Sequence, residues 1–445
     1  MIKKLSTYLN TSTRIAPLVV FRIAFGALMF LSIIRFILKG WVYNMYVMPK
    51  IYFPYFGFEW VKPLPETGMY IVFVLLLLSS LGILFGLLYR FSALTFFLLF
   101  TYIELIDKTN YLNHYYFVSI VSFMLIFVPA AQSFSLDNKI LKRQNTTHIP
   151  QFYILIFQFQ MALVYFFAGL AKVNYDWLFE AQPLKIWLPA FSHYPIIGNL
   201  MEKDWIAYFF SWFSCIYDLC IGFLLFQKRF VKYAYMLVII FHVATALFFN
   251  IGMFPYIMMT ITLIFFGPSF HETILRLLGK KEKTADEQQE RQFDFTVAKT
   301  LVFVFLCFFI IQITLPFRYV FYPGKLFWTE QGYRFSWRVM LMEKAGTAFF
   351  YVTDKKSGRQ SEVDNKEYLT YMQEKMMATQ PDMMVDYAKF LKKEYIKKGY
   401  HDPIVTSQCY VTLNGSGSRL FIDPNVDLAM QSNSFLQTKS WVHSY

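Results

Sequence analysis

Long apolar runs separated by short polar segments dominate residues 1–316. A membrane-spanning helix needs roughly 20 predominantly apolar residues. Nine runs come close to or exceed that length, and they predict a multi-pass α-helical membrane protein with about nine transmembrane helices, at 15–38, 69–89, 91–106, 115–131, 152–171, 205–226, 233–250, 254–270 and 297–316. The segment 272–296 is polar and indicates a solvated loop.

The pattern changes in 317–445, which predicts a small mixed α/β domain outside the membrane. The run VMLMEKAGTAFFYVTD before KKSGR is typical of a strand that enters a turn. Residues 365–398 have a helical pattern interrupted at Pro381, and QCYVTLNGSGSRLFI predicts a hairpin with Gly415 and Gly417 in its turn. We therefore expect two domains, 1–316 and 317–445.

Composition supports the membrane assignment. The 445 residues are 56% hydrophobic and 16% charged, whereas soluble domains carry about 25% charged residues. The net charge of +13 is unaccompanied by a nucleic-acid-binding motif, so we expect no nucleic-acid partner. The four cysteines form no CxxC pair and predict no thiol chemistry.

Basic residues in the connections predict the orientation, because they gather on the cytoplasmic side. With a cytoplasmic N-terminus, sixteen Lys and Arg residues lie inside and eight outside. Nine spans then place the C-terminal domain outside, in the periplasm of a bacterial inner membrane or in a lumen.

Polar residues inside or beside spans are expensive and often functional. Three groups fall on the predicted outer side: IDKTNYLNHYYF with Asp107, Asn113 and His114, FFAGLAKVNYDW with Lys172, and His242 followed by NIGMFPY at 250–256. We expect them to share one pocket near the outer interface.

Each candidate has two interpretations. Lys172 follows an apolar run and Ala168-Gly169, so it is either a lysine that extends to the interface or a buried amine, kept neutral by desolvation, that acts as a base. His114 either bonds its neighbours or, with Asn113, stabilises an oxygen anion. His242 is either a core histidine with its hydrogen bonds satisfied or a member of the functional site. No paired-ligand spacing indicates a metal site, and we expect none.

Several motifs in order resemble the vitamin K-dependent gamma-glutamyl carboxylase family, in its prokaryotic-type members with a horizontally transferred transmembrane domain. They are DKTNYLNH, FAGLAKVNYDW, FHVATALFFNIGMFPY and LPFRYVFYPGKLFWTEQGYRFSWRVM, over roughly 100–345. The resemblance implies a carboxylase/epoxidase that oxidises reduced vitamin K, of menaquinol or phylloquinol type, with O2. The strong base so formed would deprotonate glutamyl side chains of a protein or peptide for carboxylation by CO2.

The resemblance also implies residue roles. Lys172 matches the base that deprotonates the quinol, and Asn113 and His114 match a pair beside the reacting ring. The expected quinol- or substrate-binding residues are His242, Tyr256, Trp337, Arg334 and Asp107. Two alternatives remain, a quinol epoxidase without peptide carboxylation and a non-enzymatic membrane transporter or lipid-binding protein. The sequence indicates no oligomeric state.

Overall fold

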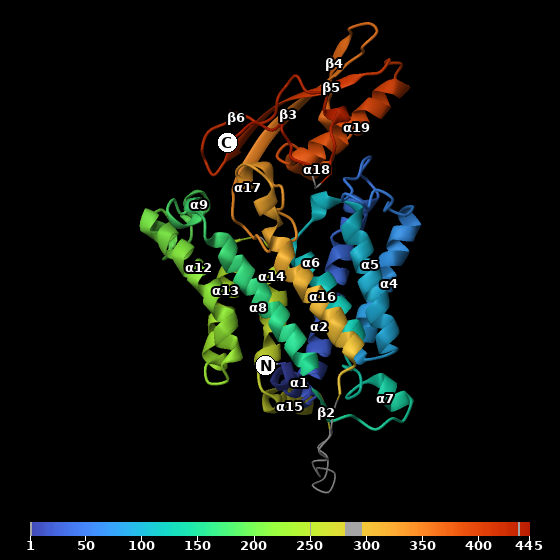
Figure 1. The fold of residues 1–445 in the computed structure, drawn as a ribbon, viewed down its shortest axis with the longest axis vertical. Helices are drawn as coiled ribbons and strands as arrows, with labels where there is room; N and C mark the ends of the chain where they lie inside the picture. The colour runs from blue at the N-terminus through green and yellow to red at the C-terminus, as the bar shows by residue number, and fades with distance from the viewer. Residues whose placement is uncertain (1, 250, 281–295, 435–436) are drawn as a thin grey trace.

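The computed structural model describes residues 2–249, 251–280, 296–434 and 437–445. Figure 1 shows a bundle of long helices with a region of strands and helices at one end. Part of the predicted loop 272–296 and Asn250 of NIGMFPY lie outside the described residues.

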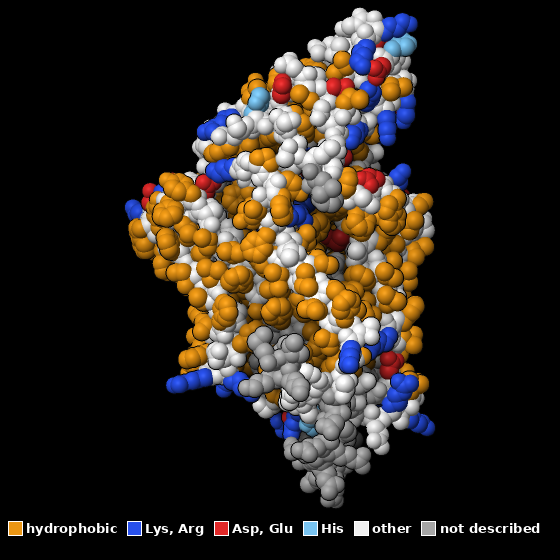
Figure 2. All heavy atoms as spheres, in the orientation of Figure 1, with side chains coloured by type: hydrophobic (Ala, Val, Ile, Leu, Met, Phe, Trp, Pro, Cys, Tyr) orange, Lys and Arg blue, Asp and Glu red, His pale blue; other side chains and the backbone are white. Residues whose placement is uncertain are grey.

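Seven helices are long and apolar enough to cross a membrane: α2 (Ala16–Leu38), α4 (Glu66–Phe85), α5 (Tyr89–Ile106), α8 (Phe152–Lys172), α12 (Asp204–Phe226), α13 (Val231–Phe248) and the stretch Lys299–Phe321, whose α-helical part is α16 (Lys299–Thr314). Hydrophobic side chains cover the visible face of the bundle (Figure 2). The chain is thus a multi-pass helical membrane protein with strands in its C-terminal region.

The other two predicted spans differ from straight crossings. The fourth is α6 (Asn113–Phe127), which at 15 residues is short for a span. The eighth, 254–270, is α14 (Phe254–Thr262) with a 3-10 turn to Phe265, and it bends by 117° into α15 (Pro268–Leu277). Proline lacks an N–H and disfavours helix in the residue before it, which explains the break at Gly267-Pro268. The count in the described residues is therefore seven spans, or eight if the bent pair is one span.

Short elements connect the long helices, and the sequence pattern did not predict them. The strands β1 (Ser12–Arg14) and β2 (His148–Pro150) pair antiparallel. The short helices are α1 (Ile2–Leu9), α3 (Trp41–Tyr46), α7 (Leu136–Ile140), α9 (Tyr175–Leu178), α10 (Leu184–Trp187), α11 (Gly198–Met201) and α17 (Leu326–Thr329).

The C-terminal region has the predicted strands, helices and hairpin. A four-stranded antiparallel sheet in the order β4-β3-β5-β6 is built from β3 (Lys344–Thr353), β4 (Gln360–Glu362), β5 (Ile404–Leu413) and β6 (Arg419–Leu420). The helices α18 (Tyr371–Met377) and α19 (Pro381–Lys397) pack on it. Pro381 occupies the first turn of α19, where its missing N–H is harmless.

Ion pairs and hydrogen bonds join this region to the ends of the bundle helices. Lys108, which follows α5, donates to Asp386 at 2.7 Å and to Asp382 at 2.9 Å, both in α19. Gln373 of α18 donates to Asp107 at 2.9 Å. The four-stranded sheet with α18 and α19, called the strand domain below, therefore sits on the bundle through buried and partly buried polar contacts.

Candidate functional site

The site begins where α8 and α12 approach closely. Gly169 of α8 faces the backbone of Asp218 and Leu219, and the Cys215 thiol lies 3.7 Å from the Gly169 carbonyl oxygen. Small residues permit such close helix packing in membranes. The last turn of α8 is therefore held directly against the middle of α12.

This approach brings the amine of Lys172 into an ion pair with the carboxylate of Asp218. Lys172 is 7% exposed and Asp218 is 4% exposed, so hydration by solvent stabilises neither charge strongly. The amine is also 3.4 Å from the carbonyl oxygen of Ala168. A buried ion pair is maintained because loss of either partner leaves the other charge uncompensated. The interpretation of Lys172 as an isolated neutral amine omitted this acidic partner.

An apolar cavity of about 370 Å³ opens beside the ion pair. Such a volume lies in the range of roughly 300–1,000 Å³ that is typical of small-molecule sites. Lys172, Asp218, Asn113, His242 and Trp337 all line it. Aromatic side chains make up much of the remaining wall, among them Phe117, Tyr165, Trp177, Trp187, Phe209, Phe210, Phe213, Phe241, Phe248, Phe249 and Phe254.

Two buried polar atoms of the lining have no hydrogen-bond partner in the described residues: Nδ1 of His242 and Nε1 of Trp337. The other imidazole nitrogen, Nε2 of His242, is 3.3 Å from the hydroxyl of Tyr165. Buried polar groups are normally paired. A largely aromatic cavity with two unpaired polar atoms and a buried ion pair therefore suits an aromatic ligand that carries a few oxygen atoms.

Asn113 fixes the segment that carries Trp337. Its side-chain amide donates to the carbonyl oxygen of Arg338 at 2.7 Å, and its Oδ1 accepts from the hydroxyl of Tyr111 at 3.0 Å. That hydroxyl in turn accepts from the backbone N–H of Phe335 at 2.7 Å. Phe335 and Trp337 have φ of +59°, a strained backbone that surrounding contacts must hold in place.

His114 is buried but does not line the cavity. Its ring packs against Tyr115 at 4.6 Å and Phe254 at 5.9 Å between centroids. Phe254 itself lines the cavity. The ring of Phe254 therefore lies between His114 and the cavity that Asn113 lines.

Three other predicted binding residues lie elsewhere. Arg334 donates to Asp382 of α19 at 2.8 Å, and Asp107 accepts from Gln373 of α18, so both contact the strand domain. Tyr256 is 50% exposed. Of the residues expected to share one pocket, Asn113, Lys172 and His242 line the same cavity. Trp337, from the segment after the last span, also lines it.

Sequence reasoning missed Asp218, the residue closest to Lys172. The signal was available, because Asp218 is the one acidic residue inside the apolar run 205–226. A carboxylate in a span is a functional candidate by default. In the part of the chain that the structure describes, no group of three His, Cys, Asp or Glu side chains is arranged to hold a metal.

Two family models together match most of the chain. The first, described as "HTTM domain", matches residues 10–270. The second, described as "Vitamin K-dependent gamma-carboxylase, lumenal domain", matches residues 297–445. No solved structure matches the chain.

Proposed function

The chain belongs to the vitamin K-dependent gamma-carboxylase family, and from that premise we propose that it oxidises reduced vitamin K to its epoxide with O2 and carboxylates glutamyl side chains with CO2. The observation that carries the proposal is the buried Lys172–Asp218 pair at the wall of an apolar cavity inside a membrane bundle. The family implies the quinol, the two gases and a glutamyl acceptor.

The cavity fits a lipophilic quinol. Its aromatic wall matches an aromatic ring and an isoprenoid chain, and the unpaired Nδ1 of His242 and Nε1 of Trp337 can bond to ring oxygens. When bound, reduced vitamin K supplies the oxidative driving force that makes a base strong enough for the glutamyl γ-carbon. The residues around it exclude the water that would quench such a base.

We assign the first proton transfer to Lys172 and Asp218 acting together. The Lys172 ammonium would pass a proton to the Asp218 carboxylate and the amine would take the proton of the quinol hydroxyl, so that the pair ends as an ammonium beside a neutral carboxyl. In a tightly coupled pair this proton belongs to both groups rather than to one. Asp218 therefore allows Lys172 to act without first being a free neutral amine.

Asn113 and His242 serve as positioning and binding residues in this proposal. Asn113 holds the segment that carries Trp337, as its bond to the Arg338 carbonyl suggests. His242 lines the cavity, its Nδ1 has no partner among the described residues, and its Nε2 is held by Tyr165. His114 would act through Phe254 rather than by direct contact.

We also propose a cytoplasmic N-terminus with the strand domain on the outer side. Lys and Arg side chains gather at the end of the bundle opposite the strand domain (Figure 2). The connection between α12 and α13 lies at that end, and it carries Lys228 and Arg229, with Lys232 in the first turn of α13. Basic residues at the cytoplasmic face support this orientation. The quinol would enter from the bilayer and the peptide from the aqueous side.

One assay tests the function. Purified protein in lipid nanodiscs receives reduced vitamin K, O2, labelled CO2 and a glutamyl peptide, and both epoxide and fixed CO2 are measured. We expect both products from the wild type, neither from Lys172→Ala, and both from Lys203→Ala, which changes an exposed lysine. Epoxide without fixed CO2 would identify a quinol epoxidase, and wild-type protein that forms neither product would refute the proposal.

A further inference from the structure

The segment after the last span borders three cavities. Trp337 lines the first, which is the cavity proposed for the quinol. Ser336 and Arg338 line a second cavity of about 230 Å³, and Phe335 lines a third of about 330 Å³. The third cavity shares no lining residue with the other two. It is therefore a separate space, and an inference about it does not depend on the proposed function.

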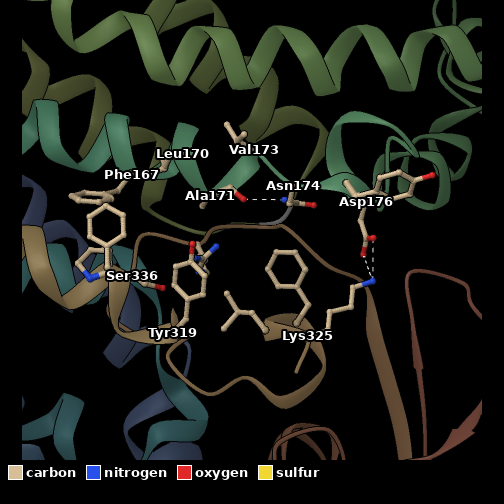
Figure 3. Close-up of a pocket in the computed structure, with 15 residues that line it drawn as sticks. Phe167, Leu170, Ala171, Val173, Asn174, Asp176, Tyr319, Lys325 and Ser336 are labelled. Carbon is tan, nitrogen blue, oxygen red and sulfur yellow. Dashed lines mark hydrogen bonds and ion pairs between the residues drawn. The ribbon is translucent and has the colours of Figure 1, made fainter. Parts of the chain in front are cut away.

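The acidic groups that line these cavities differ in their partners. In the second cavity, Asp176 is held by Lys325 at 2.9 Å, as Figure 3 shows. In the first, Asp218 is paired with Lys172. Glu104 lines the third cavity, is partly buried, and has no hydrogen bond or ion pair within the described residues. No Lys or Arg is among the groups that act on its charge, whereas a charge withdrawn from water is normally paired.

Aromatic rings form the wall near this carboxyl group. Three tyrosine rings lie around Phe335 in the lining of the cavity, those of Tyr55, Tyr111 and Tyr116. Their centres are 5.5, 5.0 and 4.9 Å from the centre of the Phe335 ring. Burial raises the pKa of the Tyr55 phenol and the nearby charge of Glu104 raises it further. A carboxyl group beside aromatic faces is a combination that binds an organic ammonium group.

The rest of the cavity is apolar and runs deeper into the bundle. Glu104 lies close to the end of α5 that meets the strand domain, and Phe97 lines the cavity about 10 Å deeper in the same helix. Phe123 of α6 lies 5.4 Å from Phe97 and 5.8 Å from Phe308 of α16 between ring centres. Two of the 16 residues of α16 are buried, so this helix packs loosely beside the cavity. The visible face of the bundle is hollowed beside α16, with an acidic side chain set back among apolar ones (Figure 2).

A cation that suits a phosphate lies next to the same aromatic rings. The guanidinium of Arg318 is 5.8 Å from the centre of the Phe335 ring and donates to the carbonyl oxygen of Arg334. No carboxylate is among the groups that act on its charge, and a guanidinium has further donors to offer. Arg318 would repel a simple amine bound at Glu104. An ammonium joined to a phosphate matches both side chains.

We propose that the third cavity binds a phospholipid whose headgroup carries an ammonium beside a phosphate. The ammonium bonds to Glu104 and faces the tyrosine rings, the phosphate contacts Arg318, and an acyl chain extends past Phe97 and Phe308. A headgroup at the helix ends with a chain running deeper is the arrangement of a lipid in a bilayer.

Tyr111 connects this lipid site to the first cavity. Its hydroxyl accepts from the backbone N–H of Phe335 and donates to Oδ1 of Asn113, which lines the first cavity. A lipid packed against Phe335 therefore supports the strained segment that carries Trp337. We expect such a lipid to raise the unfolding temperature of the protein.

Lipid binding to the full chain in detergent tests the site. Phosphatidylethanolamine and its N-acetyl derivative, which keeps the phosphate and both chains but loses the ammonium, are titrated singly and counted by native mass spectrometry. We expect wild type to bind phosphatidylethanolamine about tenfold or more tightly than the derivative. Glu104→Gln should remove that preference and Tyr55→Leu should reduce it. Arg318→Gln should weaken the binding of both lipids, because both keep the phosphate.

Glu66→Gln is the matched control, because Glu66 is an exposed glutamate at the start of α4, at the same end of the bundle. It should leave the preference unchanged, and thermal unfolding without added lipid shows that each variant is folded. Wild type without a preference, or a full preference in Glu104→Gln or in Tyr55→Leu, would overturn the inference. Displacement of the lipid by glycerophosphoethanolamine at equal affinity would assign the cavity to a water-soluble amine and defeat the lipid assignment.

Discussion

Gly169 of α8 lies against Leu219 of α12, so closely that a Cβ added to Gly169 would be 2.7 Å from the Leu219 backbone nitrogen. Such a contact with backbone is shorter than packed atoms tolerate, and one of the helices would have to move. Lys172 is one turn further along α8, and Asp218 precedes Leu219. The glycine therefore sets the separation on which the ion pair depends.

Gly169→Ala should consequently impair activity without touching any ligand. We expect a loss of at least about tenfold in product formation, since a shift of about 1 Å can cost on the order of 100-fold in an oriented site. The measurement is the epoxide assay together with thermal unfolding in detergent. Gly267→Ala is the matched control, because no atom lies within 4 Å of the Cβ that it would add. Full activity in Gly169→Ala would show that the helix contact is not limiting.

The ion pair allows stability and activity to be separated. Lys172→Met leaves the Asp218 carboxylate buried without its cation, and breaking a buried pair in this way costs about 3–5 kcal/mol. The double variant Lys172→Met/Asp218→Leu should recover most of that stability, because apolar replacement of both partners is often neutral. Thermal unfolding and the epoxide assay are run on both variants.

We expect the double variant to remain inactive although it is stable. Arg14→Ala is the stability control, since Arg14 and Glu272 form an ion pair with side chains 53% and 30% exposed, and exposed pairs contribute about 1 kcal/mol or less. Activity in the stable double variant would exclude the pair from the reaction.

Apolar length and turn residues were sufficient to predict most of the fold. The runs at 152–171 and 205–226 became α8 and α12 within one residue at each end, because a helix that is hydrophobic on all sides leaves few alternatives in a bilayer. Gly415 and Gly417, at φ of +74° and +83°, lie in the predicted turn between β5 and β6. The bend at Pro268 was missed because hydropathy averages over a proline that interrupts a run.

The candidate site was predictable only in part. Polar residues in or beside spans identified Asn113, Lys172 and His242, which share a cavity. The pairing of Lys172 with Asp218 depends on the packing of α8 against α12, which no local pattern encodes. Arg334 and Asp107 stand next to site residues in sequence, but their side chains turn towards α18 and α19. Position in the sequence could not distinguish residues that line the cavity from residues that contact the strand domain.

Docking of the strand domain should depend on pH through Asp382. Although burial opposes its ionisation, Arg334 and Lys108 hold the pKa of Asp382 far below its usual value. A carboxylate with a depressed folded pKa stabilises fully above its unfolded pKa, near 4, and loses that contribution as pH falls below it. Burial raises the pKa of neighbouring Asp386, which acts in the opposite sense.

Asp382→Asn isolates the contribution of Asp382. We expect the variant to unfold at a lower temperature than wild type at pH 7, with the difference shrinking between pH 4 and pH 3. Thermal unfolding, followed by limited proteolysis of the strand domain, measures the difference between variant and wild type at each pH. Glu362→Gln changes an exposed carboxylate and serves as the control. A constant difference across this pH range would exclude Asp382 as the titrating group.

Lys344 at the start of β3 should be a strong determinant of the strand domain's stability. Its amine donates to Glu330 at 2.9 Å and to the carbonyl oxygens of Trp328 at 2.7 Å and Thr379 at 2.6 Å, so all three of its protons are used. Burial lowers its pKa, and Glu330 opposes that effect. Lys344→Met would leave a carboxylate and two carbonyls unpaired, which should cost about 3–5 kcal/mol.

Lys397→Met removes an exposed pair with Glu394 on the same domain and should change stability by less than about 1 kcal/mol. Equal unfolding temperatures for the two variants would mean that the buried lysine does not hold α17, α18 and β3 together.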